Sequence, residues 1–202
     1  MKIIAHGVKD AKAARKAISH GVDFVEIDVS KRFLFNKFTS QHNGLMGLFG
    51  FGPLLEKILT AEFRTRAFLD LKPVSPRASF AFKLSELLIK MKLEDPKICG
   101  HNWAMISALA YQNNAKPYYT LKNQRSINKF RRMIKNLKKP AGFSVHHDLI
   151  NEKFMQEFKK KSVEIWTFTV NDIHEAKRLT ELKVDGIITD KWENLLSLVR
   201  HH

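Results

Sequence analysis

The chain alternates eight times between a short apolar run and a longer amphipathic segment, and this alternation constrains its fold more than any other feature. Each apolar run is short enough to form a buried parallel strand, and the segments between the runs have the spacing of surface helices. Eight strand and helix pairs with right-handed crossovers close most economically into a small (β/α)8 TIM barrel of the α/β class, with an open doubly wound sheet as the alternative. The predicted strands are Lys2–Ala5, Phe24–Val29, Ala67–Leu71, Lys97–Gly100, Pro117–Tyr119, Gly142–Val145, Val163–Thr167 and Gly186–Ile188.

Residues typical of helix starts support this division of the chain. Asp10 precedes the first helix, and Ser75 with Pro76 precedes the helix after the third strand. Asp172 with Glu175 resembles a capping box at the start of a later helix. The 202 residues leave little room beyond a barrel, so we expect a single domain over residues 1–200 without an inserted subdomain.

The cysteine content and the hydropathy argue against a secreted or membrane-spanning protein. Cys99 is the sole cysteine, so an intramolecular disulfide is excluded and a reducing compartment is expected. Lys9 and Asp10 occur before a signal-peptide hydrophobic stretch could form. The longest uncharged runs, 43–55 and 101–115, fall short of the roughly 18 apolar residues that a transmembrane helix needs. We therefore expect a cytoplasmic protein, with peripheral membrane contact as an addition.

The net charge of +15 predicts anionic partners, which include phosphate-bearing substrates, anionic membranes and nucleic acid. No acidic residue occurs within 96–147, although this stretch is rich in lysine and arginine. Most of these charges are interpreted as the solvated face of one amphipathic helix, with membrane or polyanion contact as the alternative, because four apolar residues recur there at helical spacing: Ile127, Phe130, Ile134 and Leu137. No nucleic-acid recognition motif accompanies the charge, so nucleic acid is not the expected partner.

Acidic and basic side chains stand at the ends of the second and third predicted strands. Glu26 and Asp28 flank Ile27, and they share one face because side chains alternate along a strand. If Ile27 packs outward against the helices, both carboxylates point into the barrel mouth. Asp70 and Lys72 repeat this arrangement on the next strand. Active sites of such barrels lie at the carboxyl ends of the strands, so these four residues form a candidate site.

Charge counting favours a cation among these side chains. Three carboxylates against the one ammonium of Lys72 leave a charge near −2 in a partly buried place, which is costly unless a cation binds. Oxygen ligands suit Mg²⁺ or Ca²⁺, and Mg²⁺ is the ion that we expect. The alternative to a metal site is an ion network in which the carboxylates and Lys72 satisfy one another. His6 ends the first strand and His42 follows the second, and a pair of histidines beside such a cluster suits general acid and base catalysis.

These residues stand in stretches that resemble the glycerophosphodiester phosphodiesterases, in the same order along the chain. The resemblance implies a barrel fold, a divalent metal on Glu26, Asp28 and Asp70, and catalytic histidines at His6 and His42. It also implies that Lys72 contacts the phosphate and that Trp166 walls the pocket. The stretches are Ile4–Gly7, Val25–Val29, Gln41–Asn43, Leu69–Lys72, Ile165–Asp172 and Val184–Asp190.

The chain also departs from the usual pattern of this family. Gly7 follows His6 directly where the family has an arginine, so Lys9 is the candidate replacement for that phosphate-binding cation. His42 and Asp70 are too close in sequence for the family's inserted subdomain. The missing arginine, the missing insert and the Asp-Leu-Lys order are similar to the related phospholipases D of spider venom. Those enzymes are secreted and disulfide-bonded, so reaction type is better indicated than substrate.

A glycine-rich apolar segment follows His42 directly. The segment Leu45–Phe51 lies within a run of four glycines and five large apolar residues. It is expected either to fold back as a plug of the core or to be exposed beside the metal, where it would contact acyl chains or an anionic membrane.

We therefore expect a metal-dependent phosphodiesterase of lipid metabolism. It would hydrolyse or cyclise glycerophosphodiesters or lysophospholipids and release an alcohol, with the two histidines as general acid and base. The alternative is a catalytically inactive barrel that binds phosphate-bearing ligands or anionic membrane surfaces.

Overall fold

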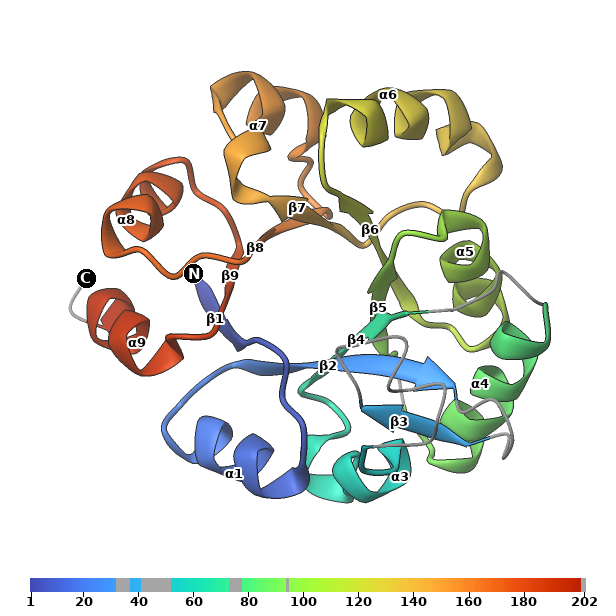
Figure 1. Ribbon diagram of the computed structural model, residues 1–202. Coiled ribbons are helices and arrows are strands. Elements are labelled where there is room, and N and C mark those ends of the chain that lie inside the picture. The colour runs from blue at the N-terminus through green and yellow to red at the C-terminus, as the bar shows by residue number, and fades with distance from the viewer. Residues whose placement is uncertain (32–36, 41–51, 73–77, 94, 201–202) are drawn as a thin grey trace.

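The computed structural model describes residues 1–31, 37–40, 52–72, 78–93 and 95–200. Its eight parallel strands form a closed ring surrounded by helices, in the order β1-β9-β8-β7-β6-β5-β4-β2, with β1 paired back to β2 (Figure 1). The (β/α)8 barrel predicted from the alternation is therefore confirmed. The parallel strands are β1 (Lys2–Ala5), β2 (Phe24–Lys31), β4 (Ala67–Leu71), β5 (Lys97–Gly100), β6 (Lys116–Leu121), β7 (Gly142–His146), β8 (Glu164–Phe168) and β9 (Gly186–Thr189).

A ninth strand, β3 (Phe38–Ser40), was not predicted. It pairs antiparallel with the end of β2, with Val29 opposite Ser40 and Lys31 opposite Phe38. This pairing lengthens β2 by two residues beyond its predicted end at Val29. Three residues are too short a run to give a periodic signal, which explains why the sequence pattern missed this strand.

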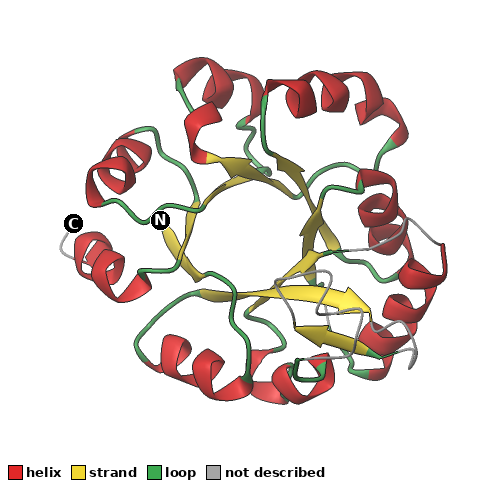
Figure 2. Ribbon diagram, in the orientation of Figure 1, coloured by secondary structure: helices red, strands yellow, loops and turns green. Residues whose placement is uncertain are grey.

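The helices lie outside the ring of strands (Figure 2). Asp10 and Asp172 cap two of them as predicted, each accepting a hydrogen bond from the backbone N–H three residues on. The expected start at Ser75 and Pro76 lies outside the described residues. The helices are α1 (Ala11–Ser19), α3 (Leu55–Ile58), α4 (Ala78–Lys90), α5 (Trp103–Gln112), α6 (Gln124–Met133), α7 (Glu152–Phe158), α8 (Ile173–Glu181) and α9 (Trp192–Arg200), and the 3-10 turns are Ala61–Phe63, Ile134–Asn136 and His147–Leu149.

The basic stretch forms α6, whose apolar side faces the barrel. Ile127 and Phe130 are buried, whereas the basic residues of the helix, Arg125, Lys129, Arg131 and Arg132, are exposed. The predicted helix ends earlier than expected, because the chain tightens into a 3-10 turn at Ile134, and this residue is 44% exposed. Within the described residues, no helix combines the length and the apolar character needed to cross a membrane.

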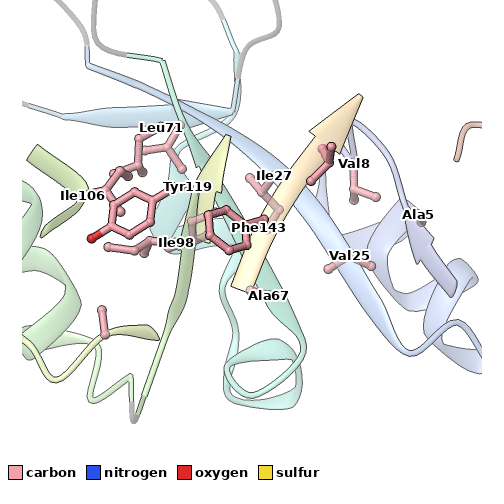
Figure 3. Close-up of a cluster of buried hydrophobic side chains, with 14 of the residues drawn as sticks. Ala5, Val8, Val25, Ile27, Ala67, Leu71, Ile98, Ile106, Tyr119 and Phe143 are labelled. Atoms are coloured by element: carbon pink, nitrogen blue, oxygen red, sulfur yellow. The ribbon is translucent and has the colours of Figure 1, made fainter. Parts of the chain in front are cut away.

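Two hydrophobic layers fill the molecule. The larger layer lies between the strands and the helices and includes Ile27, Ile98, Tyr119 and Phe143, which Figure 3 shows at close range. Since Ile27 belongs to this outer layer, its neighbours on β2 point to the inside of the barrel.

The smaller layer lies inside the barrel and is dominated by an aromatic plug of Phe24, Phe68, Tyr118 and Trp166. The ring of Trp166 lies 4.7 Å from Phe68, 4.9 Å from Tyr118 and 5.1 Å from Phe24, measured between ring centroids. Gly142 leaves the space for this packing, because a Cβ there would lie 2.3 Å from Tyr118. The plug fills the barrel below the polar residues, so the site lies at the carboxyl ends of the strands.

Candidate active site

Three carboxylates meet at this end of the barrel. Glu26 and Asp28 come from β2 and Asp70 from β4, and the strand register places Asp28 directly beside Asp70. One oxygen from each lies within 4.8 Å of the others, and Glu26 and Asp28 are almost fully buried, at 3% and 2% exposure. We call these three residues the carboxylate cluster. Their predicted convergence is confirmed.

Lys72 already pairs with two members of the carboxylate cluster. Its Nζ hydrogen-bonds to Asp70 and lies 3.1 Å from Asp28 Oδ1. Burial disfavours the ammonium, but Asp70 and Asp28 outweigh burial and raise the pKa of Lys72 well above its ordinary value. Lys72 is therefore charged and provides part of the ion network that was the alternative interpretation of these residues.

Glu26 shows that one ammonium does not balance the cluster. Burial, followed by the charges of Asp28 and Asp70, raises the pKa of Glu26 well above its ordinary value. Its Oε2 accepts a 2.7 Å hydrogen bond from the N–H of Gly7, whose φ of +60° lies in the left-handed region that favours glycine. The cluster is thus stabilised either by a proton or by a further cation.

The donor set fits a divalent cation with a preference for oxygen. Three carboxylate oxygens within reach of one another are ligands that Mg²⁺ and Ca²⁺ prefer. In the described part of the chain, Asp70 Oδ1 is buried and has no hydrogen-bond partner. A buried acceptor of this kind is costly without a partner, and a cation supplies one.

His6 faces the cluster and is oriented from behind. Its Nε2 lies 3.9 Å from Glu26 Oε2, whereas its Nδ1 lies 2.7 Å from Asp190 Oδ1. A carboxylate only accepts hydrogen bonds, so Nδ1 donates to Asp190 and Nε2 is the ring nitrogen on the side of Glu26. Asn171 donates to Asp190 Oδ2 at 2.8 Å and accepts from the Asp190 N–H at 3.0 Å, which fixes that carboxylate.

The positioning pair Asp190 and Asn171 was not predicted. Each stands in a stretch that carries the family resemblance, and this was the signal that could have found them. Single polar residues after distant strands have no spacing that links them to His6.

The far wall of the pocket comes from β5 to β8 and was also not predicted. It includes His101, Lys122, Thr120, Ser144 and Phe168. Desolvation, followed by the charge of Lys122, lowers the pKa of His101 to about 4, so this imidazole is neutral at physiological pH. The wall therefore offers hydroxyl groups, a neutral imidazole and one lysine to a ligand.

Other predicted site residues lie elsewhere. Trp166 has no exposed surface and belongs to the aromatic plug, so the prediction that it walls the pocket is not supported; Phe168, two residues further along β8, lines the pocket instead. Lys9 is exposed and does not line the pocket among the described residues. His42 and Leu45–Phe51 lie outside the described residues.

Comparison with known proteins identifies the family. A model of the glycerophosphoryl diester phosphodiesterase family matches residues 78–194, which is more than half of the chain. The chain belongs to this family. Members of the glycerophosphoryl diester phosphodiesterase family are phosphoric diester hydrolases, so the resemblance stated from the motifs is confirmed. No curated protein sequence matches the chain significantly.

Solved structures of the family share the fold along the whole chain. An Oleispira antarctica phosphodiesterase in complex with the product sn-glycerol-3-phosphate has a TM-score of 0.78 at 16% identity, with 99% of this chain and 97% of that chain covered. A Thermotoga maritima glycerophosphodiester phosphodiesterase has a TM-score of 0.75 at 19% identity, with 97% of each chain covered. A Parabacteroides distasonis glycerophosphodiester phosphodiesterase has a TM-score of 0.76 at 16% identity, with 99% and 97% covered.

Proposed function

We propose that the chain is a metal-dependent phosphodiesterase that acts on small glycerophosphodiesters and releases an alcohol. The observation that carries this proposal is the carboxylate cluster facing His6, with Asp190 behind the imidazole. The product bound in the Oleispira antarctica structure, sn-glycerol-3-phosphate, supports a glycerophosphodiester as the substrate class. Lysophospholipids are the second substrate class to test.

Glu26, Asp28 and Asp70 would hold the divalent ion, with Mg²⁺ favoured over Ca²⁺. When bound, such an ion offsets the charge that builds on the phosphate oxygens during the reaction. Lys72 adds a fixed positive charge to the same side of the pocket, where it attracts and orients the phosphate.

His6 would supply one proton-transfer group. Because Asp190 keeps the proton on Nδ1, Nε2 can take a proton from the attacking oxygen or, once protonated, give one to the leaving oxygen. The attacking oxygen comes from water or from a hydroxyl of the substrate. The first forms an open phosphate monoester and the second a cyclic phosphate, and in both cases the P–O bond to the leaving alcohol breaks.

A second proton-transfer group is needed, and we propose His42 for it. The nearest described residue before it is Ser40, whose Oγ donates a 3.1 Å hydrogen bond to the carbonyl of Val8 in the β1–α1 loop. His101 on the pocket wall is the competitor for this role. A loss of about 10²-fold or more in kcat for His42→Gln, with His101→Gln nearly unchanged, would support His42.

The central experiment follows glycerophosphocholine and lysophosphatidylcholine by phosphorus NMR, with Mg²⁺ or with chelator. This measurement separates a cyclic phosphate from an open monoester. We expect turnover that the chelator abolishes and that His6→Gln lowers about 10²- to 10⁴-fold. Glu164→Gln, at the opposite end of the barrel, is the matched control and should retain activity. Full activity of a Glu26→Gln, Asp28→Asn double variant would refute the site.

One observation favours the second candidate, a barrel that binds phosphate ligands without turnover. The N–H of Gly7 is engaged by Glu26, and Lys9 lies off the pocket lining, so neither replaces the arginine that the family has after its first histidine. Metal binding without turnover over a broad phosphodiester panel would establish this alternative. Contact of 45–51 with membranes is a separate proposal, and binding to anionic vesicles that Phe51→Ser abolishes would support it.

A further inference from the structure

A second group of metal-binding side chains lies on the same rim of the barrel, outside the proposed active site. It consists of His146 at the end of β7 and His147 and Asp148 in the 3-10 turn that follows, and we call it the histidine cluster. One ligand atom from each residue lies within 4.8 Å of the others. We propose that the histidine cluster binds a transition-type divalent ion, with Zn²⁺ as the favoured ion.

The contact between His146 and Asp148 suits two ligands of one metal ion. Nδ1 of His146 lies 3.5 Å from Asp148 Oδ2, and Nδ1 of His147 lies 3.2 Å from Asp148 Oδ1. An N–H···O bond spans about 2.7 to 3.2 Å between heavy atoms, so the His146 contact is too long for a good hydrogen bond, whereas the His147 contact is at the upper end of this range. Ligand atoms around tetrahedral Zn²⁺, with bonds of about 2.0 to 2.2 Å, are about 3.4 Å apart, and the His146 contact matches this separation.

The backbone and the ring stacking position His146. The N–H of Asp148 donates a long hydrogen bond of 3.4 Å to His146 Nδ1, and a metal at this nitrogen would replace that hydrogen bond. The rings of His146 and His147 are stacked, with centroids 4.7 Å apart and planes 23° apart. Two adjacent imidazoles are thereby held side by side around one carboxylate.

A second carboxylate stands behind the histidine cluster. Oε1 of Glu175 lies 3.0 Å from His147 Nδ1, and Arg178 holds Glu175 through two hydrogen bonds of 2.6 and 2.8 Å. The carboxylates of Asp148 and Glu175 outnumber the one guanidinium of Arg178, so the net charge around the histidine cluster is negative, although the whole chain is strongly basic. Because Nδ1 of His147 contacts Glu175, this ring would bind the metal through Nε2, and a carboxylate on the other ring nitrogen is a common second layer of metal sites.

The two clusters differ in the chemistry of their ligands. The carboxylate cluster offers oxygen atoms, which suit Mg²⁺ and Ca²⁺, whereas the histidine cluster offers two imidazoles and one carboxylate, which suit Zn²⁺. The ring of His146 also packs edge-on against Phe168, a residue of the pocket lining, at 5.8 Å between centroids. A metal bound there would therefore lie next to the mouth of the pocket.

The test measures Zn²⁺ binding by calorimetry and Co²⁺ binding by visible absorption, in excess Mg²⁺ so that the carboxylate cluster is occupied. All proteins carry His201→Ala and His202→Ala, so that the terminal pair does not contribute. We expect His147→Ala, Asp148→Asn and His146→Ala to weaken Zn²⁺ binding at least about tenfold, and Glu175→Gln about 10- to 100-fold. His174→Ala, an exposed histidine of α8, is the matched control and should bind as the parent does.

Thermal unfolding supplies the readout that a merely structural role would not give. Zn²⁺ should raise the midpoint of the parent and of His174→Ala but leave His147→Ala unchanged, because only a ligand that binds the folded state shifts the midpoint. If His147→Ala fails to fold, His146→Ala and Asp148→Asn decide. Zn²⁺ binding that all three variants leave unchanged, or no binding by the parent, would overturn the proposal. Both results are independent of phosphodiesterase activity.

Discussion

Replacing Lys72 with methionine tests whether this ammonium holds the carboxylate cluster together. At 4.8 Å and an effective dielectric constant of about 20, two ionised carboxylates repel by about 3.5 kcal/mol, so three ionised carboxylates are strongly unfavourable. The attraction between Lys72 and Asp28 at 3.1 Å, calculated in the same way, is about 5 kcal/mol and offsets part of this repulsion. This value does not include the cost of desolvating the two charges.

The expected loss of stability is smaller than these sums. Removing one partner of a buried ion pair costs about 3 to 5 kcal/mol, and the side chain of Lys72 is 29% exposed, so we expect about 3 kcal/mol. For a chain of this length, that corresponds to a fall of about 6 to 12 °C in the unfolding midpoint. At low pH, Glu26 takes up a proton and the repulsion among the carboxylates decreases, so the loss of stability in Lys72→Met is smaller. The measurement is therefore made near pH 8.

The assay is urea unfolding in chelator, repeated with Mg²⁺. Mg²⁺ should stabilise Lys72→Met more than the wild type, because the added ion replaces the missing ammonium. The stability of the variant should also fall more steeply as pH rises, since its folded state binds more protons than its unfolded state. Lys122→Met, at the exposed lysine of the same pocket, is the control. Equal stabilities of the two variants in chelator would refute this reasoning.

Further predictions concern packing, pH and capping. Gly142→Ala should destabilise the barrel by about 1 to 3 kcal/mol in urea unfolding, because the new methyl group would lie 2.3 Å from Tyr118 and 2.6 Å from the carbonyl of Glu164; a neutral effect would contradict the packing of the plug. His101 has a folded pKa of about 4, below the 6.5 of an unperturbed histidine, so the unfolded state binds more protons between these values and stability decreases as the pH is lowered through that window. His101→Gln should flatten this part of the pH–stability curve, and identical curves would count against a neutral imidazole. Asp172→Ala should cost about 1 kcal/mol in urea unfolding through loss of the α8 cap, and an unchanged midpoint would show that the cap is dispensable.

The barrel was predictable because its strands are nearly continuous apolar runs separated by amphipathic helices. The predicted strand starting at Phe24 and the one starting at Gly186 begin where the structure has them, since burial on both faces dictates their composition. The strand β3 and the end of α6 were missed or misplaced, because both depend on local pairing and turn geometry rather than on periodicity.

The acidic part of the site was predictable for a related reason. Strands that follow one another in the chain lie side by side in a barrel, so Glu26, Asp28 and Asp70 had to meet. The sequence does not show how far below the pocket an inward-facing residue of a strand lies. Trp166 and Phe168 share the inward face of β8, yet the first lies in the buried plug and the second on the pocket lining.

The aromatic plug has a consequence for substrate entry and product release. With Trp166 and its neighbours packed beneath the carboxylates, the described interior opens toward the carboxyl ends of the strands. In the part of the barrel that the structure describes, a phosphodiester would enter, and both of its fragments would leave, through this opening. Departing fragments and the next incoming molecule would then share one route.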